Sequence, residues 1–408
     1  MIATIPLLHD NHNHVSLYAA FSSCIDISRQ APGDAWTLLC KLPRNQLSVV
    51  RGWKSFELPM TRDALASLPP LLLINFSLHG FAVSDSGLQY VEQTVPQVAE
   101  HRNNQAWCEA HVPAIFAAYC DLTGIDEGKL VSYIDAMVPL GIGSSDEMTV
   151  PTMEALDRCV ASSYTERLGL WIAPELYRKV DKPRRKAVVG TKLYLDGAIG
   201  ARSAAIRGPW IGAGTAMFTY TDTALCGLLD EIGSWDTGVA MHAIGEMAIE
   251  QALTALEKAV ANGARFKLIR LEHLQFIDEH QARRAKRLGA VLSMQPNFSS
   301  DSRDYKDRLP ESYLRRNNPF RMLIDEAGFE PGRDLIFGSD GMPDGIAYAA
   351  TESLFPAYPA QRLSLDELIA GYGPARGVSG AVTLEIDEDN GRAVVIATKF
   401  DSQSPRRQ

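Results

Sequence analysis

Short runs of branched and aliphatic residues alternate along this chain with longer segments of helical periodicity. Such alternation is typical of a parallel β-sheet covered by helices. The runs that we interpret as strands are residues 5–12, 142–148, 168–173, 188–195, 239–243, 266–273, 291–295 and 335–339. There are eight of them, which predicts an α/β protein with the (β/α)₈ TIM barrel fold.

Two segments between the runs have the pattern of amphipathic helices. Segment 246–262 places six apolar residues near helical spacing, and segment 278–288 follows the same pattern. Helices with one apolar face pack that face against a sheet. We therefore expect both helices to cover the outside of the barrel.

The interval from about residue 15 to 140 is too long for one connection between a strand and a helix. It contains Trp53, Trp107, several prolines and the apolar run 71–76. We interpret it as a large insertion after the first strand. Loops that follow barrel strands lie at the catalytic face, so we expect this insertion to shape the substrate pocket.

The C-terminal part of the chain predicts a small β-element. A helix-like segment at 364–372 is followed by VTLEIDEDNGRAVVIATKF, in which two alternating runs flank Asp389-Asn390-Gly391. This is a strong hairpin signal. The predicted organisation is a barrel with its insertion over 1–375, a β-element over 376–400 and a frayed tail over 401–408.

Composition and charge narrow the class of partner. Of the 408 residues 46% are apolar, which suits a globular protein with a large core. The net charge of −9 argues against a nucleic-acid or anionic-membrane surface and favours a small-molecule substrate.

The six cysteines form no C-x-x-C pair, so we expect reduced thiols. We find no signal-peptide pattern and no run of 18 apolar residues, and expect a cytoplasmic protein, with a homo-oligomer left open.

The first candidate site lies at the end of the first run, in Asp10-Asn11-His12-Asn13-His14. Side chains at i and i+2 of an extended strand point to the same side, so His12 and His14 can both reach one metal ion. A polar turn is the alternative interpretation of this short motif.

Two more histidines, His242 and His273, stand where predicted strands end. A lone histidine in such a place is more often a core residue than a ligand. In a barrel, however, the strand ends converge on one face, so these histidines would be neighbours in space. We interpret both as candidate ligands of the same metal centre.

Asp340 follows the last run, in Phe337-Gly338-Ser339-Asp340-Gly341. A carboxylate can bind a divalent cation through one oxygen and take a proton from water through the other. The alternative is a helix N-cap, a position that aspartate often occupies. The position of Asp340 opposite the strand that carries His12 and His14 favours the catalytic role.

Lys192 lies inside a predicted buried strand, where a bare ammonium has a heavy desolvation cost and cannot ligate a cation. Addition of carbon dioxide would give an anionic carbamate with two oxygens that can bridge two metals. The alternatives are a lysine that extends to solvent and a lysine paired with Asp196.

Nearby Arg202 can recognise a substrate carboxylate with two hydrogen bonds, although a single arginine is more often structural.

Together these motifs resemble the amidohydrolase superfamily, in the amidohydrolase 3 branch that includes N-substituted formamide deformylases. The resemblance runs from the first strand to Asp340, and is specific in TKLYLDGAIGARSAA, HAIGEMAIEQAL, RLEHLQ and FGSDGMP. It is weaker in RGWKSF and LHGFAVSDSGL, where Trp53 and His79 resemble residues that line the pocket from the insertion.

The resemblance implies a binuclear centre, with two zinc or similar divalent ions. His12, His14 and Asp340 would hold one ion, His242 and His273 would hold the other, and carboxylated Lys192 would bridge them. A metal-activated hydroxide would attack the substrate carbonyl, and Asp340 would pass its proton to the leaving group. Metal ions make water nucleophilic near neutral pH, so this assignment agrees with the residue chemistry.

The chain departs from the family pattern in three places. Ser84-Asp85-Ser86 replaces an expected asparagine, and Glu246 stands where aspartate is common. Family members usually have a β-rich segment before the H-x-H strand, which joins the C-terminal strands in a small sandwich domain. Here His12 is close to the first residue, so we expect that sandwich to be absent or reduced to the C-terminal hairpin.

The sequence therefore predicts a hydrolase that cleaves an amide-type, non-peptide C–N bond of a small molecule, such as an N-acyl, N-formyl or cyclic amide. A mononuclear, deaminase-like relative with unmodified Lys192 is the first alternative. A catalytically silent barrel with a binding role is the second.

Overall fold

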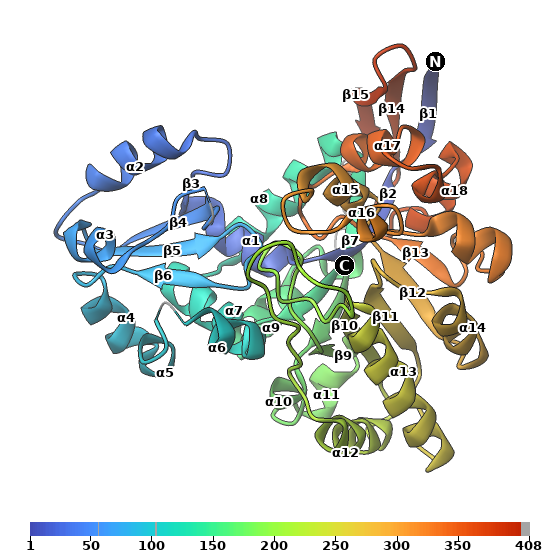
Figure 1. Ribbon diagram of the computed structural model, residues 1–408, viewed down its shortest axis with the longest axis horizontal. Helices are drawn as coiled ribbons and strands as arrows, with labels where there is room; N and C mark the ends of the chain where they lie inside the picture. The colour runs from blue at the N-terminus through green and yellow to red at the C-terminus, as the bar shows by residue number, and fades with distance from the viewer. Residues whose placement is uncertain (56, 103, 401–408) are drawn as a thin grey trace. The chain divides into compact units, whose positions relative to one another are not determined.

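The computed structural model describes residues 1–55, 57–102 and 104–400. The predicted tail at 401–408 lies outside the described residues. The chain forms two compact units, of which the first is Met1–Ser16 with Leu130–Gln408 and the second is Leu17–Lys129. Each sheet lies within one unit. Figure 1 labels the helices and strands.

The first unit is built on an eight-stranded sheet in which every ladder is parallel. Its strands, in sheet order, are β13 (Leu335–Phe337), β12 (Val291–Met294), β11 (Ile269–His273), β10 (Gly238–Ala243), β9 (Val188–Tyr194), β8 (Leu168–Ile172), β7 (Ile142–Val150) and β2 (Leu8–Asn13). Strands and helices alternate along the chain, which confirms the predicted α/β barrel.

The ends of this sheet approach each other directly after β13. The backbone N–H of Asp340 donates to the carbonyl oxygen of His12 at 2.6 Å. Gly338 lies in the same connection, and a Cβ atom at this position would collide with the backbone nitrogen of His12. The close approach of the first and last strands therefore requires a residue without a side chain at 338.

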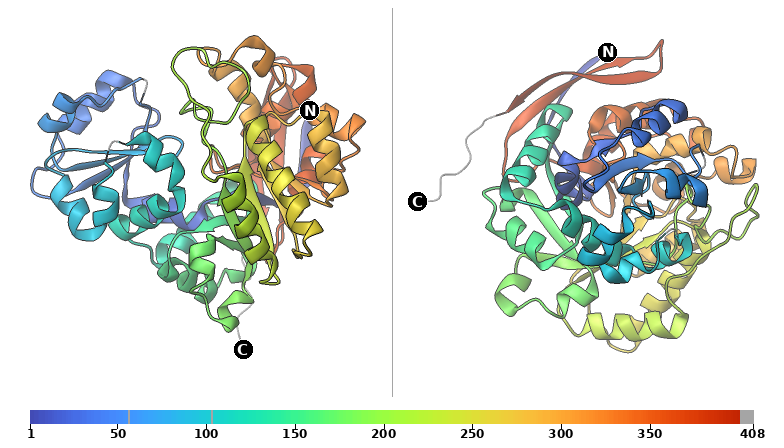
Figure 2. Two further views of the ribbon diagram at one scale, coloured as in Figure 1. Left: turned by 60° about the horizontal axis from the view of Figure 1, so that its bottom comes forward. Right: turned by 90° about the vertical axis from the view of Figure 1, so that its left-hand side faces the viewer.

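Helices α13 (Glu246–Ala261) and α14 (Glu279–Arg287) confirm the two helices expected from the sequence. Asp278 and Gln281 form a reciprocal capping box that satisfies backbone N–H groups at the start of α14. Arg284 of α14 forms ion pairs with Glu250 and Glu257 of α13. Figure 2 shows these helices side by side on the outside of the strands.

The remaining helices of the first unit are short or connect successive strands. They are α9 (Met153–Ala161), α10 (Pro174–Tyr177), α11 (Lys182–Arg185), α12 (Asp222–Gly233), α15 (Asp301–Asp304), α16 (Glu311–Leu314), α17 (Ile346–Leu354) and α18 (Leu365–Tyr372). Helix α18 confirms the helix expected near 364–372, and Ser364 caps it. Helix α8 (Glu127–Met137) begins in the second unit and continues into the first, which resumes at Leu130.

A three-stranded antiparallel sheet has the order β1-β14-β15, with β1 (Ile2–Pro6), β14 (Gly380–Asp387) and β15 (Arg392–Phe400). The hairpin of β14 and β15 was predicted, but β1 was not. The run at 5–12, interpreted as a single strand, is divided at Leu7, whose N–H donates to the carbonyl of Gly380. The β-element thus combines residues from both ends of the described chain.

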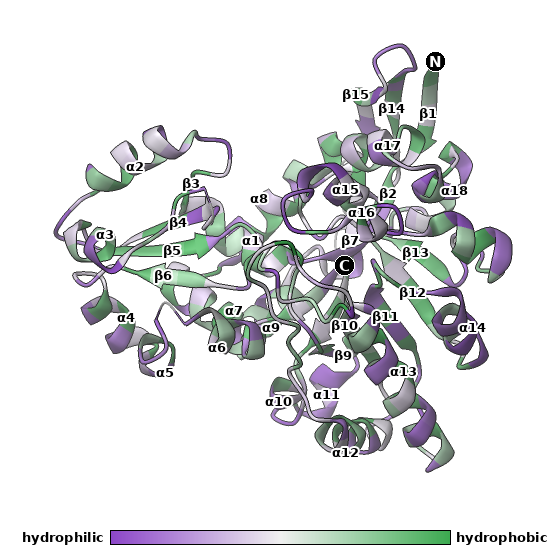
Figure 3. Ribbon diagram, in the orientation of Figure 1, coloured by the Kyte–Doolittle hydropathy of each residue, from purple (hydrophilic) through white to green (hydrophobic). Residues whose placement is uncertain are grey.

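The second unit contains a four-stranded sheet in the order β3 (Ile25–Asp26), β4 (Ser48–Trp53), β5 (Leu71–Asn75) and β6 (Phe81–Val83). Strands β3, β4 and β5 are parallel, and β6 is antiparallel to β5. Apolar residues of β5 are fully buried in its core, and Figure 3 shows the hydrophobic character of this strand. The interval interpreted as an insertion therefore holds a sheet with its own core.

The helices of the second unit are α1 (Val15–Ala20), α2 (Pro32–Cys40), α3 (Arg62–Ser67), α4 (Leu88–Thr94), α5 (Pro96–Ala99), α6 (Gln105–Ala110) and α7 (Val112–Thr123), of which α1 begins just before the division at Leu17. Among the described residues of both units, no helix is long and apolar enough to cross a membrane.

Candidate metal centre

The polar side chains singled out in the sequence stand at the carboxyl ends of four barrel strands and in the segment after a fifth. His12 and His14 are at the end of β2, Lys192 is on β9, and His242 and His273 are at the ends of β10 and β11. Asp340 follows β13. Because these strands are parallel, their carboxyl ends lie at the same edge of the sheet.

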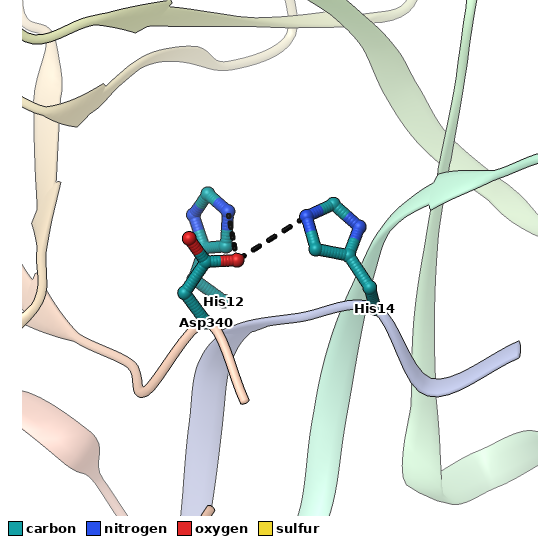
Figure 4. A group of neighbouring side chains, drawn as sticks. All are labelled: His12, His14 and Asp340. Atoms are coloured by element: carbon teal, nitrogen blue, oxygen red, sulfur yellow. Dashed lines mark ion pairs between the residues drawn. The ribbon is translucent and has the colours of Figure 1, made fainter. Parts of the chain in front are cut away.

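His12, His14 and Asp340 form a compact group of metal-ligating atoms. Asp340 Oδ1 lies 3.6 Å from His12 Nε2 and 3.2 Å from His14 Nε2. One ligand atom from each residue lies within 4.8 Å of the others, and all three residues are buried. Figure 4 shows the two imidazoles directed toward the carboxylate. The H-x-H motif thus brings both rings to one point, as the spacing predicted.

The other two candidate histidines, His242 and His273, lie next to this group. The ring centroid of His273 lies 4.7 Å from that of His12 and 4.5 Å from that of His242. His273 therefore stands between His12 and His242. The structure brings together all four histidines that were predicted as candidate ligands.

Lys192 is buried in the barrel, with 1% of its surface exposed. Its Nζ has no hydrogen-bond partner among the described residues and lies 5.3 Å from the ring centroid of Tyr194. Burial lowers the pKa of Lys192 to about 8, although the negative charges of Glu272 and Asp340 oppose this effect. A lysine that extends to solvent does not match this arrangement.

Pairing of Lys192 with Asp196 does not match the structure either. The Asp196 carboxylate accepts hydrogen bonds from the backbone N–H groups of Ala205, Ile244 and Gly245. These bonds tie the long loop after β9 to the start of the connection after β10. Asp196 is therefore engaged by the backbone, and no ion pair to Lys192 is found among the described residues.

Burial would raise the pKa of Asp340, but electrostatic interactions with the neighbouring imidazoles and with Lys192, and a hydrogen bond from His14, hold it at about 2. The pKa of His12 is well below its ordinary value because of burial, with a further contribution from the charge of Lys192. Burial also lowers the pKa of His273, as do the neighbouring His242 and His12. Neutral imidazoles and an ionised carboxylate are the forms that bind metal ions.

Two of these residues occupy the left-handed region of backbone conformation, which residues with a side chain seldom adopt. The φ angle is 71° at His273 and 58° at Asp340. Leu274, which follows His273, also has a positive φ of 54°. Such strained conformations cluster at functional sites, where the surrounding structure imposes them.

Hydrogen bonds from the opposite side of each ring orient three of the histidines. His12 Nδ1 donates to Glu272 Oε2 at 2.7 Å, and His273 Nδ1 donates to Gln295 Oε1 at 2.8 Å. His242 Nε2 donates to the carbonyl of Gly197 at 3.2 Å. Glu272 and Gln295 were not among the residues predicted from the sequence, although a carboxylate inside a predicted buried strand was a signal that could have identified Glu272.

The structure bears on two roles that were considered for residues of the site, a helix N-cap for Asp340 and substrate recognition for Arg202. Asp340 is not an N-cap, because α17 begins at Ile346 after Gly345. The Arg202 guanidinium lies 3.2 Å from the Asp307 carboxylate, so an ion pair engages the arginine that was considered for substrate recognition.

The residues expected to line the pocket from the insertion lie in the second unit. His79 Nδ1 lies 3.2 Å from Glu109 Oε2, and Trp53 Nε1 donates to the carbonyl of Leu58 at 2.7 Å. Ser84, at the place of the family asparagine, accepts the N–H of Leu71 at 2.9 Å. The roles of His79 and Trp53 toward a substrate remain predictions.

Parts of this chain are similar to known proteins. Residues 153–352 match the model of the amidohydrolase family Amidohydro_3. A relative described as "Putative amidohydrolase YtcJ" from Bacillus subtilis (strain 168) is 25% identical over 367 residues, which are 78% of this chain and 67% of that protein. Protein LONG AFTER FAR-RED 3 from Arabidopsis thaliana is 30% identical over 118 residues, which are 28% of this chain and 20% of that protein.

Two solved structures share the fold. An uncharacterized metal-dependent hydrolase from Pyrococcus furiosus superposes with a TM-score of 0.62 at 19% identity, covering 90% of this chain and 81% of that one. Its counterpart from Pyrococcus horikoshii OT3 gives a TM-score of 0.63 at 18% identity, covering 90% and 80%. The chain is thus similar to the amidohydrolase 3 branch of the amidohydrolase superfamily, and the family model matches residues 153–352.

Proposed function

We propose that this chain is a metal-dependent hydrolase that cleaves an amide-type C–N bond of a small molecule, such as an N-acyl, N-formyl or cyclic amide. The observation that carries the proposal is the group of His12, His14 and Asp340, with ligand atoms within 4.8 Å of one another. The similarity of residues 153–352 to the amidohydrolase family model supports the same reaction class.

The donor set fits a divalent metal ion. Imidazole nitrogens and a carboxylate oxygen are the ligands that zinc and similar first-row ions accept. His12 Nε2 is buried and has no hydrogen-bond partner among the described residues, so its lone pair is available to an ion. A second ion would be held by His242 and His273, whose rings lie 4.5 Å apart.

Lys192 fits the role of a bridging ligand after reaction with carbon dioxide. Its pKa of about 8 gives a fraction of neutral amine at physiological pH. The neutral Nζ forms a bond to the carbon of carbon dioxide and loses one proton, which gives a carbamate anion. The observation that favours this modification is a buried Nζ without a hydrogen-bond partner among the described residues, on the strand next to the one that carries His242.

In the proposed mechanism, metal ions held by the histidines and Asp340 would supply Lewis acidity and lower the pKa of water. The residues of this chain position the Asp340 carboxylate and transfer the proton. Asp340 is fixed by the bond between its N–H and the His12 carbonyl, which holds its carboxylate beside the imidazoles. From this position it accepts the proton of the attacking water and delivers it to the leaving nitrogen.

The test combines metal analysis with a substrate screen. Purified protein is expected to contain about one to two zinc or comparable ions per chain. Removal of the ions by a chelator should abolish hydrolysis in a screen of N-acyl, N-formyl and cyclic amides, and zinc should restore it. Full hydrolytic activity of metal-free protein would overturn the proposal.

A mononuclear centre with unmodified Lys192 is a second candidate. It is favoured by the fact that His12, His14 and Asp340 are the one close group of three potential His, Cys, Asp or Glu ligands among the described residues. Growth or incubation with ¹³C-bicarbonate separates the two candidates. A carbamate carbon signal that disappears in Lys192→Arg supports the binuclear centre, and its absence in the fully loaded wild type supports the mononuclear one.

A further inference from the structure

The imidazole of His12 is held on its far side by a buried carboxylate. His12 Nδ1 and Glu272 Oε2 lie 2.7 Å apart, and the side chains are 1% and 0% exposed. A carboxylate accepts hydrogen bonds, so the proton of a neutral His12 is on Nδ1. This tautomer leaves the lone pair on Nε2, the atom that faces Asp340.

Arg270 holds Glu272 in this orientation. Its Nε donates to Glu272 Oε1 at 2.8 Å, and one terminal nitrogen lies 3.3 Å from Oε2. The same guanidinium donates to the carbonyl of Asn11 at 2.6 Å, directly before His12 in β2. Arg270 therefore fixes both the carboxylate and the backbone that carries the imidazole.

Arg270 also has partners on two further strands. Asp146 Oδ2 on β7 lies 2.5 Å from a terminal nitrogen of Arg270, and Ser293 Oγ on β12 accepts a hydrogen bond at 3.0 Å. The network thus spans strands β2, β7, β11 and β12 inside the barrel. A buried arginine with this many partners is rigid, which makes it a precise support for Glu272.

The corresponding partners of the other oriented histidines are weaker. His273 donates to the neutral amide oxygen of Gln295 at 2.8 Å. His242 Nε2 donates to a backbone carbonyl at 3.2 Å and has the Asp196 carboxylate at 3.4 Å, where Asp196 already accepts three backbone N–H groups. Charge-assisted hydrogen bonds are shorter and stronger than neutral ones. His12 therefore has the strongest anionic partner of the three.

We propose that Glu272 and Arg270 are positioning residues that make His12 the more basic ligand, so that the ion on His12, His14 and Asp340 binds more tightly than the ion on His242 and His273. This inference rests on the proposed metal-dependent function. Outer carboxylates fix the ring orientation of a metal-bound histidine and raise its basicity. Loss of the Glu272 charge should weaken the first ion and leave the second largely unchanged.

The test measures metal affinity. Metal-free wild type and the variants Glu272→Gln and Glu279→Gln are titrated with Co²⁺ in competition with a chromophoric chelator, and the visible spectrum of bound Co²⁺ is recorded. Glu279→Gln is the matched control, because it removes a carboxylate from an exposed ion pair with Arg283 on α14. We expect Glu272→Gln to raise the Kd of the tighter ion about 10- to 100-fold and to alter its spectrum. Equal Kd values and spectra for the wild type and Glu272→Gln would overturn the inference.

A measurement on the wild type avoids dependence on the folding of a variant. In ¹⁵N-histidine-labelled, metal-free protein, the neutral His12 ring should show the Nδ1-protonated tautomer, with its signal identified by its absence in His12→Gln. A ring protonated on Nε2 would also overturn the inference. Wild type that binds neither Co²⁺ nor Zn²⁺ would instead contradict the proposed function, so the two failures are distinguishable.

Discussion

The backbone N–H of Asp340 donates to the carbonyl oxygen of His12 at 2.6 Å, and the carboxylate of Asp340 lies 3.6 Å from the His12 imidazole. One pair of residues therefore joins the last strand region of the barrel to the first and forms part of the candidate metal centre. Because Asp340 is held by its backbone, the direction of its carboxylate follows from the closing of the sheet.

Gly338→Ala should disturb both the barrel closure and the metal centre. A Cβ at this position would collide with the backbone of His12 and with Asp10, neither of which can move freely. We expect a loss of about 1–3 kcal/mol in the free energy of unfolding, together with weaker metal binding. Denaturant unfolding and metal titration measure the two effects.

Gly227→Ala is the control for this prediction, because Gly227 lies within α12 and a Cβ there meets no atom within 4 Å. Alanine is the better helix former by about 1 kcal/mol, so this variant should be at least as stable as the wild type. A Gly338→Ala variant as stable as Gly227→Ala would show that the close approach to His12 is not a constraint.

Asp340→Asn should abolish proton transfer while preserving the shape of the side chain. We expect kcat to fall about 10²- to 10⁴-fold on any amide substrate that the screen identifies. The control is Asp325→Asn, which removes a carboxylate from an exposed pair with Arg321 and should leave kcat unchanged. Unchanged turnover in Asp340→Asn would mean that another group moves the proton.

Acid should destabilise the barrel through the buried His9. Burial lowers the pKa of His9, although Asp146 raises it and Arg376 and Arg270 lower it further. A histidine with a lowered folded pKa binds a proton more readily when unfolded. The free energy of unfolding therefore falls as the pH falls below the unfolded histidine pKa of about 6.5.

The effect of His9 can be isolated by His9→Gln. The decline in stability between about pH 6.5 and pH 5 should be shallower in this variant than in the wild type, when measured by denaturant unfolding at several pH values. His280→Gln, which removes an exposed imidazole from α14, is the control. Parallel pH profiles of His9→Gln and the wild type would contradict the assignment.

Ser84 should be a structural residue of the second unit. Its Oγ donates to the carbonyl of Pro69 at 2.7 Å and accepts the N–H groups of Leu71 and Gly87 at 2.9 and 3.0 Å. Because the site is buried, Ser84→Ala leaves polar groups without partners and should cost about 1–3 kcal/mol. Unfolding of the variant, with Ser67→Ala on an exposed part of α3 as the control, measures this cost.

Most of the barrel follows from local pattern. The strands after the first run are found within a few residues of their predicted positions, because a strand buried on both faces is a continuous apolar run. The division at Leu7 could not be predicted in this way. The apolar run continues across Leu7 and Leu8, and pairing with β14 depends on residues near the other end of the described chain.

The histidine and aspartate ligands were predicted because each stands where a strand ends, and Lys192 was predicted because it lies inside a buried strand. The residues that orient these ligands were not predicted, because their contacts join different strands. Glu272 and Arg270 lie within the same predicted strand as His273, and the desolvation argument applied to Lys192 would have selected them. Gln295 gives no comparable signal, because an amide at the end of a strand is common and its contact with His273 requires the sheet register.

The central claim is that side chains from β2, β9, β10, β11 and the segment after β13 hold metal ions. Anomalous diffraction from crystals of zinc-loaded protein, collected on both sides of the zinc absorption edge, tests it most directly. The account predicts an anomalous peak between His12, His14 and Asp340, with the Glu272 carboxylate still on His12 Nδ1. Fully loaded crystals with no peak at these residues would contradict it.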